Sequence, residues 1–204
     1  MSVTEGGFRE LAAIMFTDMV GYSALMQRSE GIAVELVEEH RRLLRSIFPT
    51  HSGREIETAG DSFLVEFDST LHAVRCAIEI QSKLHERNSA LEARKRIHVR
   101  VGIHVGEVLR RENHVYGDGV NIAARIQPLA DPGGICISED VAKQIQNKLD
   151  LRILKLGRRN LKNIHTEVDI CAIALPWSGD KIYRSNRLSE LLNKWKTYLL
   201  TPLR

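Results

Sequence analysis

Short apolar runs of strand length alternate along this chain with longer segments of helical periodicity, and this order requires a sheet with helices packed against it. The predicted strands cover residues 11–17, 54–58, 63–67, 97–103, 105–109, 135–137, 151–156 and 168–175. The predicted helices cover residues 30–48, 69–91, 119–129 and 138–146, with Ser69 and Ser138 as N-cap candidates. The pattern indicates an α+β or α/β sandwich with one sheet covered by helices.

The charge of the chain is unevenly distributed. Its 204 residues suffice for one domain and a short extension, and the net charge is +3. Residues 176–204 hold six Lys or Arg against two acidic residues, whereas residues 1–175 hold 23 basic and 24 acidic residues. The excess positive charge therefore belongs to the tail, and the near-neutral body argues against a nucleic-acid partner.

The three cysteines are widely spaced, and each sits among apolar residues without a CxxC or Cys/His metal spacing. Buried, reduced thiols are expected. The N-terminus has no signal-peptide core, and no apolar run is long enough to span a bilayer. We therefore expect a cytoplasmic protein, with the cytosol as the redox compartment.

Two aspartates stand where strands end. Asp18 follows the apolar run 11–17, and Asp61 occupies the turn between two strands that form a hairpin. Carboxylates at adjacent strand ends can together hold Mg²⁺, which prefers oxygen ligands. The alternative is that Asp18 caps the next helix and Asp61 only makes the turn, since Asp is common at both places.

A glycine-containing loop opens the third predicted helix in HVYGDGVNIAARIQ. Asn121 and Arg125 follow it four residues apart, so they share one helix face. Arg is suited to stabilising charge that develops on transferring phosphate oxygens; the alternative is an ordinary surface Arg on a helix. The chain contains no P-loop, no dinucleotide fingerprint, no nucleophile elbow and no HExxH motif. His98 and His104 are expected on the polar face of their strand.

Four motifs together resemble the catalytic domain of class III nucleotide cyclases: FTDMVGYS, AGDSFLVEF, VYGDGVNIAAR and LKNI, in this order. The resemblance spans residues 11–175, leaving a lead of residues 1–10 and a tail of residues 176–204. It implies a ferredoxin-like α+β sandwich that works as a head-to-tail homodimer.

The resemblance also implies roles for individual residues. Asp18, Asp61 and the backbone carbonyl of Met19 would bind two Mg²⁺ or Mn²⁺ ions. Asn121 would orient the ribose of a nucleoside triphosphate, and Arg125 would stabilise the transition state. Lys162 would contact the triphosphate. Because the family dimer places the Asp pair of one protomer opposite these three residues of the other, each active site would be composite. The implied product is a 3′,5′-cyclic monophosphate, with pyrophosphate released.

The base-recognition positions depart from the commonest adenylate cyclase pattern. Glu57 stands where those enzymes usually have Lys, and His114 stands where they usually have Asp or Thr. An ionised Glu can accept from both guanine N1–H and N2–H₂, and a histidine can donate to O6. The pair therefore favours GTP, with ATP as the alternative. His114 could instead face solvent, and Glu57 could pair with Arg54 or Arg100. A catalytically silent nucleotide-binding homologue and a diguanylate cyclase are further alternatives.

The tail contains RLSELLNKWKTYLL, in which Leu and Trp recur at helical spacing among basic residues. This pattern predicts a basic amphipathic helix over about residues 185–200. A docking or coiled-coil helix is the favoured interpretation, and a membrane-surface helix is the alternative.

Overall fold

The computed structural model describes residues 7–112, 114–164 and 166–177. They form one eight-stranded sheet with the order β2-β3-β1-β4-β6-β8-β7, and β5 pairs with β4 off this path. The strands are β1 (Phe8–Met19), β2 (Arg54–Ala59), β3 (Ser62–Phe67), β4 (Val99–Arg111), β5 (His114–Tyr116), β6 (Ile135–Ser138), β7 (Ile153–Arg159) and β8 (Val168–Ile173). The α-helices are α1 (Tyr22–Arg28), α2 (Glu30–Ile47), α3 (Thr70–Ser89), α4 (Asp118–Ile126) and α5 (Glu139–Ile145). The mixed α+β class predicted from the pattern is confirmed.

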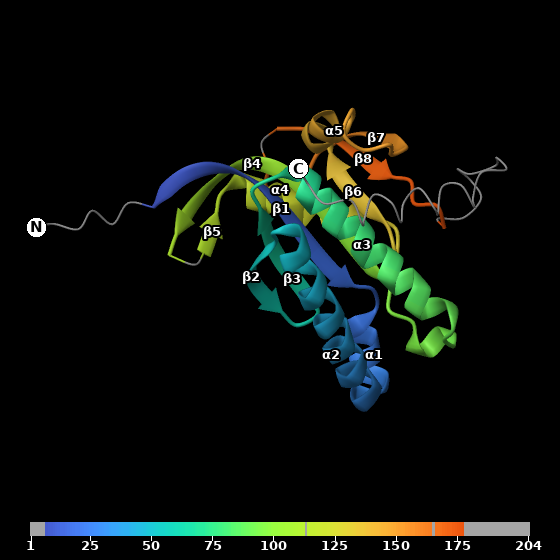
Figure 1. The fold of residues 1–204 in the computed structure, drawn as a ribbon. Helices are drawn as coiled ribbons and strands as arrows, with labels where there is room; N and C mark the ends of the chain where they lie inside the picture. The colour runs from blue at the N-terminus through green and yellow to red at the C-terminus, as the bar shows by residue number, and fades with distance from the viewer. Residues whose placement is uncertain (1–6, 113, 165, 178–204) are drawn as a thin grey trace, which may run out of the picture.

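The centre of the sheet is the antiparallel pair β1 and β4. Their register runs without a break from Phe8 opposite Arg110 to Met19 opposite Val99. The start of β1 and the end of β4 project from the body together with β5 (Figure 1). The prediction of two separate strands over 97–103 and 105–109 was wrong, because β4 continues straight through His104.

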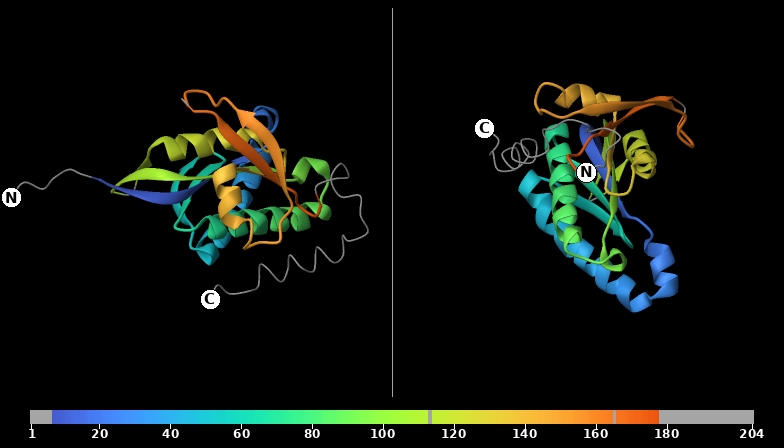
Figure 2. Two further views of the ribbon diagram at one scale, coloured as in Figure 1. Left: turned by 90° about the horizontal axis from the view of Figure 1, so that it is seen from above. Right: turned by 90° about the vertical axis from the view of Figure 1, so that its right-hand side faces the viewer.

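The two faces of the sheet are covered by different helices. Helices α2, α3 and α5 pack into one large cluster around Phe48, Phe63 and Phe67, whose side chains are almost completely buried. Burial of a side chain of this size contributes about 1.5–3 kcal/mol. Helix α4 covers the other face, so α3 and α4 lie on opposite sides of the sheet (Figure 2).

Side chains along β1 alternate between the two faces of the sheet, and this alternation shows on which face Asp18 lies. Ala13, Met15 and Met19 belong to the cluster under α2 and α3, whereas Ala12 and Ile14 belong to a second cluster that includes a residue of α4. By the same alternation, the side chain of the aspartate at position 18 lies on the α4 side of the sheet.

Several local expectations were tested by the structure. Ser69 caps α3 as predicted, because its hydroxyl accepts from the amide of Leu71 at 3.2 Å. Ser138 precedes α5, but its side chain makes no cap bond; its Oγ lies 2.8 Å from Nδ1 of His104 instead. His104 is therefore buried between packed elements, contrary to the expected polar face, whereas His98 is exposed.

Other segments differ in extent from their predictions. Helix α1 and strand β5 were not predicted, since both are short and their sequences carry no strong periodicity.

The three cysteines are buried and free, as expected. Among the described residues, no helix combines the length and the apolar character needed to cross a membrane. The predicted tail helix lies outside the described residues, which end at Trp177.

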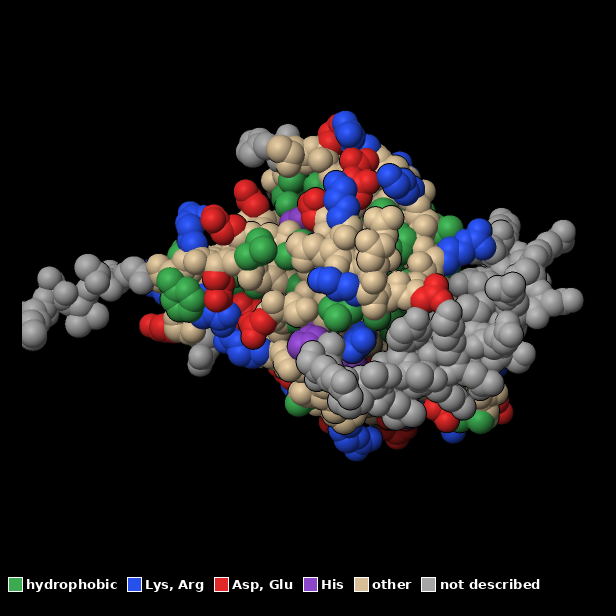
Figure 3. Space-filling model, turned by 45° about the horizontal axis from the view of Figure 1, so that its top comes forward, with side chains coloured by type: hydrophobic (Ala, Val, Ile, Leu, Met, Phe, Trp, Pro, Cys, Tyr) green, Lys and Arg blue, Asp and Glu red, His purple; other side chains and the backbone are tan. Residues whose placement is uncertain are grey.

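Charged side chains of both signs are interleaved over the described residues on the face drawn in Figure 3. Ion pairs join charges of opposite sign on the described surface, for example those of Glu139 with Lys143 at 3.1 Å and with Lys155 at 3.0 Å. On that face the described residues form a mixed surface rather than a stripe of one sign.

Gly102 of β4 allows the end of α4 to pack directly on the sheet. A Cβ atom at this position would lie 2.3 Å from the backbone nitrogen of Gln127, the residue that follows α4. Because a backbone atom cannot swing aside as a flexible side chain can, Gly102→Ala should displace α4 and lower the free energy of unfolding by about 3 kcal/mol.

Urea unfolding followed by circular dichroism measures this loss. The control is Gly31→Ala in α2, where a Cβ meets nothing within 4 Å and helix propensity favours Ala by about 0.5 kcal/mol. Equal stability of Gly102→Ala and the wild type would contradict the close packing of α4 on β4.

Candidate active site

The two predicted metal-binding aspartates lie together at one end of the sheet. Asp18 is the penultimate residue of β1, and Asp61 lies in the turn between β2 and β3. The amide of Met19 donates to Oδ2 of Asp61 at 3.0 Å. The hydroxyl of Ser62 donates to Oδ1 of Asp18 at 2.7 Å. Each carboxylate thus accepts a hydrogen bond from the residue that directly follows the other aspartate.

The two carboxylates repel each other because both are negatively charged. No cationic side chain of the described residues forms an ion pair with either. Burial, and secondly the charge of Asp18, raises the pKa of Asp61 above its ordinary value. The Met19 amide and the Arg41 guanidinium oppose this rise. Such a pair is stabilised by a divalent cation, so the donor set fits Mg²⁺ or Mn²⁺. The described residues contain no cluster of three or more His, Cys, Asp or Glu side chains that could hold a metal ion. Further oxygen ligands would therefore come from backbone, water or substrate phosphates.

The turn that carries Asp61 is shaped by Gly60, whose φ of 60° is left-handed. Its carbonyl oxygen accepts two hydrogen bonds from Arg41 of α2, from Nε at 3.1 Å and from Nη2 at 2.5 Å. Four residues later on the same helix, Arg45 makes a bidentate contact with Glu55 of β2, at 2.8 and 2.9 Å. Helix α2 therefore holds the β2–β3 hairpin at two points.

Glu57, the first predicted base-recognition residue, is exposed and unpaired among the described residues. The β2–β3 register shifts between Glu55 and Glu57, and Glu57 then stands opposite Leu64, whose side chain packs on the α4 side. The suggested partner Arg54 is engaged elsewhere, because its Nε donates to the buried Glu66 at 3.0 Å.

His114, the second predicted base-recognition residue, is the first residue of β5 and is exposed. Its ring lies 6.1 Å from that of Tyr116. The next residue, Val115, packs in the same cluster as Ile56, the neighbour of Glu57. The two predicted base-recognition residues are therefore carried by segments that share one apolar cluster.

Asn121 and Arg125 lie on α4 as predicted, and both are exposed. The helix begins after Gly117, whose φ is 128°, and the amide of Asn121 donates to the Gly117 carbonyl at 3.3 Å. Neither side chain makes a hydrogen bond or ion pair within the described part of the chain.

Lys162 follows β7 and is exposed. Its neighbour Leu161 packs in the same apolar cluster as Ile126, the neighbour of Arg125. Packing thus brings the Lys162 segment to the α4 side of the sheet. No hydrogen bond or ion pair within the described residues joins Asn121, Arg125 or Lys162 to the aspartate pair.

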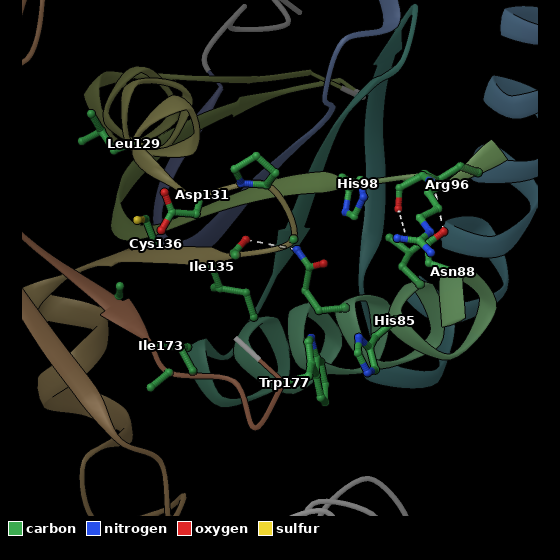
Figure 4. Close-up of a pocket in the computed structure, with 18 of the residues that line it drawn as sticks. His85, Asn88, Arg96, His98, Leu129, Asp131, Ile135, Cys136, Ile173 and Trp177 are labelled. Atoms are coloured by element: carbon green, nitrogen blue, oxygen red, sulfur yellow. Dashed lines mark hydrogen bonds between the residues drawn. The ribbon is translucent and has the colours of Figure 1, made fainter. Parts of the chain in front are cut away.

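A cavity in another part of the described chain contains none of the predicted site residues. Its volume is about 460 Å³, and its walls come from α3, the loop before β6, and strands β6, β7 and β8 (Figure 4). On one side His85 stacks on Trp177 with ring centroids 4.9 Å apart. At the candidate site, by contrast, Asp18 and Asp61 are half-buried, whereas Asn121, Arg125 and Lys162 are exposed.

Two contacts of the site were missed from the sequence. Ser62 stands in AGDSF, where its proximity to Asp18 depends on the β1–β3 pairing. Arg41 is one of several basic residues on α2, and nothing in its spacing distinguishes it from Arg42. Only the packing of α2 against the hairpin identifies it.

Residues 8–172 match the family described as the adenylate and guanylate cyclase catalytic domain. The chain belongs to this family. Its solved relatives include an adenylate/guanylate cyclase/hydrolase from Silicibacter pomeroyi, which is 33% identical. That structure superposes with a TM-score of 0.78 over 83% of this chain and 99% of the other.

Curated relatives of this cyclase domain carry names of both substrate types. "Putative adenylate cyclase 3" of Rhizobium meliloti is 38% identical over 79% of this chain and 28% of its own length. Retinal guanylyl cyclase 2 of Homo sapiens is 27% identical over 81% of this chain and 16% of its own length. The chain therefore spans less than a third of the length of these relatives, and their names do not decide between ATP and GTP.

Proposed function

We propose that this cyclase domain converts a purine nucleoside triphosphate into its 3′,5′-cyclic monophosphate and pyrophosphate. The ribose 3′-oxygen attacks the α-phosphorus, the bond to pyrophosphate breaks, and the 3′-hydroxyl proton passes to water. The observation that carries the proposal is the pair Asp18 and Asp61, two neighbouring carboxylates without an ion-pair partner among the described residues. Two Mg²⁺ or Mn²⁺ ions held there would lower the pKa of the 3′-hydroxyl and neutralise the leaving pyrophosphate.

The remaining residues bind and orient the substrate. Asp18, Asp61 and the Met19 carbonyl hold the ions, and Asn121 orients the ribose. Arg125 offsets the charge that develops around the α-phosphorus, and Lys162 contacts the triphosphate.

The active unit we propose is a head-to-tail homodimer. The aspartate pair of one protomer faces Asn121, Arg125 and Lys162 of its partner, so each site is composite. Support comes from the exposure of these three side chains, which find no partner within their own described chain. The α4 face also carries Asp18 and the segment of Lys162.

We infer that GTP is the preferred substrate. Glu57 is exposed, and Arg54, one of the two cations that could neutralise it, is bound to Glu66. The described hydrogen bonds and ion pairs include none between Glu57 and Arg100, the other one. Glu57 is thus available to accept from guanine N1–H and N2–H₂, and His114 can donate to O6. Against adenine, the Glu57 carboxylate would face the N1 acceptor unfavourably. ATP remains the alternative substrate, favoured by the relatives named adenylate cyclases.

Identification of the product tests the proposal. The purified protein is incubated with GTP or ATP and Mn²⁺, and the product mass is measured. Cyclic GMP in excess of cyclic AMP is expected. Cyclic AMP in excess would reverse the base assignment, a cyclic dinucleotide would indicate a diguanylate cyclase, and absence of any product would indicate a silent homologue.

The double variant Glu57→Lys, His114→Asp should shift preference toward ATP. The introduced ammonium group would donate where the Glu57 carboxylate accepts. Each hydrogen bond that is mismatched once the bound base covers these side chains costs about 1–3 kcal/mol. The ratio of kcat/KM for GTP to that for ATP should therefore fall by about ten- to a hundredfold. Glu86→Lys, an exposed charge reversal on α3, is the control. An unchanged ratio in the double variant would remove these residues from base recognition.

A further inference from the structure

We propose that Arg41 is a positioning residue for the metal-binding carboxylate of Asp61. This inference rests on the proposed function, because it assumes that Asp18 and Asp61 bind divalent ions. Arg41 makes no hydrogen bond to either carboxylate and would act through the backbone of the turn. Its guanidinium makes two hydrogen bonds to the carbonyl oxygen of Gly60, the residue before Asp61.

The turn needs such an external contact. Gly60 adopts a left-handed conformation, and a Cβ atom at this position would meet nothing within 4 Å, so the space on that side of the turn is open. Glycine is also the residue with the greatest backbone freedom. The described hydrogen bonds that fix the turn from outside the hairpin are therefore those of Arg41 on one side and of Met19 to Asp61 on the other.

Two effects of Arg41 on the metal have opposite signs. Its positive charge weakens the attraction of the aspartate pair for a cation, and it lowers the pKa of Asp61 only as the least of the several causes. Its two hydrogen bonds restrict the turn and thereby favour a fixed carboxylate position. The geometry favours the second effect. The planar guanidinium makes two hydrogen bonds to one carbonyl oxygen and so restricts the motion of the turn. The repulsion between its charge and the metal ion is weakened by solvent ions.

The test compares variants that separate charge from hydrogen-bond geometry. Arg41→Lys keeps the charge and loses the fork, whereas Arg41→Gln loses both. Binding of Mn²⁺ is followed by electron paramagnetic resonance in the presence of 3′-deoxy-GTP, which cannot cyclise. Loss of a contact that orients a metal ligand costs about ten- to a hundredfold in affinity. Both variants should therefore bind Mn²⁺ at least about tenfold more weakly than the wild type.

Two neighbouring arginines serve as controls. Arg42→Gln removes an exposed charge that donates no hydrogen bond to a described residue. Arg45→Gln breaks the other link between α2 and the hairpin, at Glu55, without touching the turn. Both should keep Mn²⁺ affinity within about twofold of the wild type, although Arg45→Gln should melt at a lower temperature.

Three outcomes would overturn the inference. One is tighter Mn²⁺ binding by Arg41→Gln than by the wild type, with Arg41→Lys unchanged, because the charge alone would then act. Another is an equal loss in Arg45→Gln, which would indicate general loosening of the hairpin. The third is wild-type affinity in both Arg41 variants. If the wild-type protein itself binds no Mn²⁺, the proposed function fails first, and the two failures are thereby distinguished.

Discussion

Replacing Asp61 with Asn is expected to abolish cyclic-nucleotide formation and to raise the melting temperature of the metal-free protein. Activity should fall by about three orders of magnitude or more, since metal-assisted charge stabilisation contributes several kcal/mol to such reactions. Stability should rise because burial and the charge of Asp18 raise the pKa of Asp61, so that its ionised form is disfavoured in the folded protein. A neutral amide avoids that cost and keeps the shape of the side chain.

The pH dependence of this stability gain follows from the sign of the shift. A carboxyl whose pKa is raised on folding carries no such cost at low pH; the cost grows as pH rises above the unfolded pKa and is complete above the folded pKa. The advantage of Asp61→Asn over the wild type should therefore be full above the raised pKa of Asp61 and shrink as pH falls toward the ordinary value of 3.8.

Thermal melts in EDTA, repeated with Mn²⁺, measure both effects. Mn²⁺ should raise the melting temperature of the wild type much more than that of Asp61→Asn. Asp68→Asn, at an exposed aspartate just after β3, is the control and should behave as the wild type does. Equal Mn²⁺ stabilisation of the Asp61 variant and the wild type would remove this residue from the metal site.

Mixing two inactive variants is expected to restore activity. Arg125→Ala and Asp61→Asn each disable both sites of their own homodimer. In the proposed dimer the two residues of each site come from different protomers, so a heterodimer of the two variants would have one site with both defects and one site with none. Random exchange makes about half of the dimers heterodimeric, so activity should return to about a quarter of the wild-type value.

A mixture of Asp18→Asn with Asp61→Asn is the matched control for this experiment. Both substitutions affect the same half-site, so every dimer in that mixture has two defective sites and should stay inactive. Recovery is measured as cyclic-nucleotide formation after subunit exchange. If the Arg125→Ala mixture also stays inactive while dimers form, Asn121, Arg125 and the aspartates belong to one chain and the composite site is wrong.

Much of the sheet could be predicted because most strands bury at least one face. The run at 11–17 and the hairpin at 54–67 carry strong local patterns, and β1, β2 and β3 form close to them. His104 misled the prediction of β4, since a polar residue within an apolar run suggests a break. Its ring is instead buried beside Ser138, a partner from another strand that no local pattern reveals. For the same reason Ser138 is not the side-chain cap that its position suggests.

The candidate site was predictable in part. The proximity of Asp18 and Asp61 follows from placing a strand end beside a hairpin turn, and both residues lie there. The availability of Glu57 could not be derived, because it depends on Arg54 pairing with a glutamate whose burial is a product of the folded sheet. Arg41 could not be identified for a similar reason: its partner is a backbone carbonyl.

The long pairing of β1 with β4 has a consequence for synthesis of the chain. The nearest paired residues of these strands, Met19 and Val99, are separated by roughly 80 residues, so closing this loop is entropically costly and slow. During translation, β1 emerges first and must wait, unpaired along that edge, while the hairpin and two long helices are made. The edge of the apolar strand β1 that pairs with β4 therefore stays open until β4 leaves the ribosome. A chaperone that binds β1 in this interval would protect that edge from aggregation.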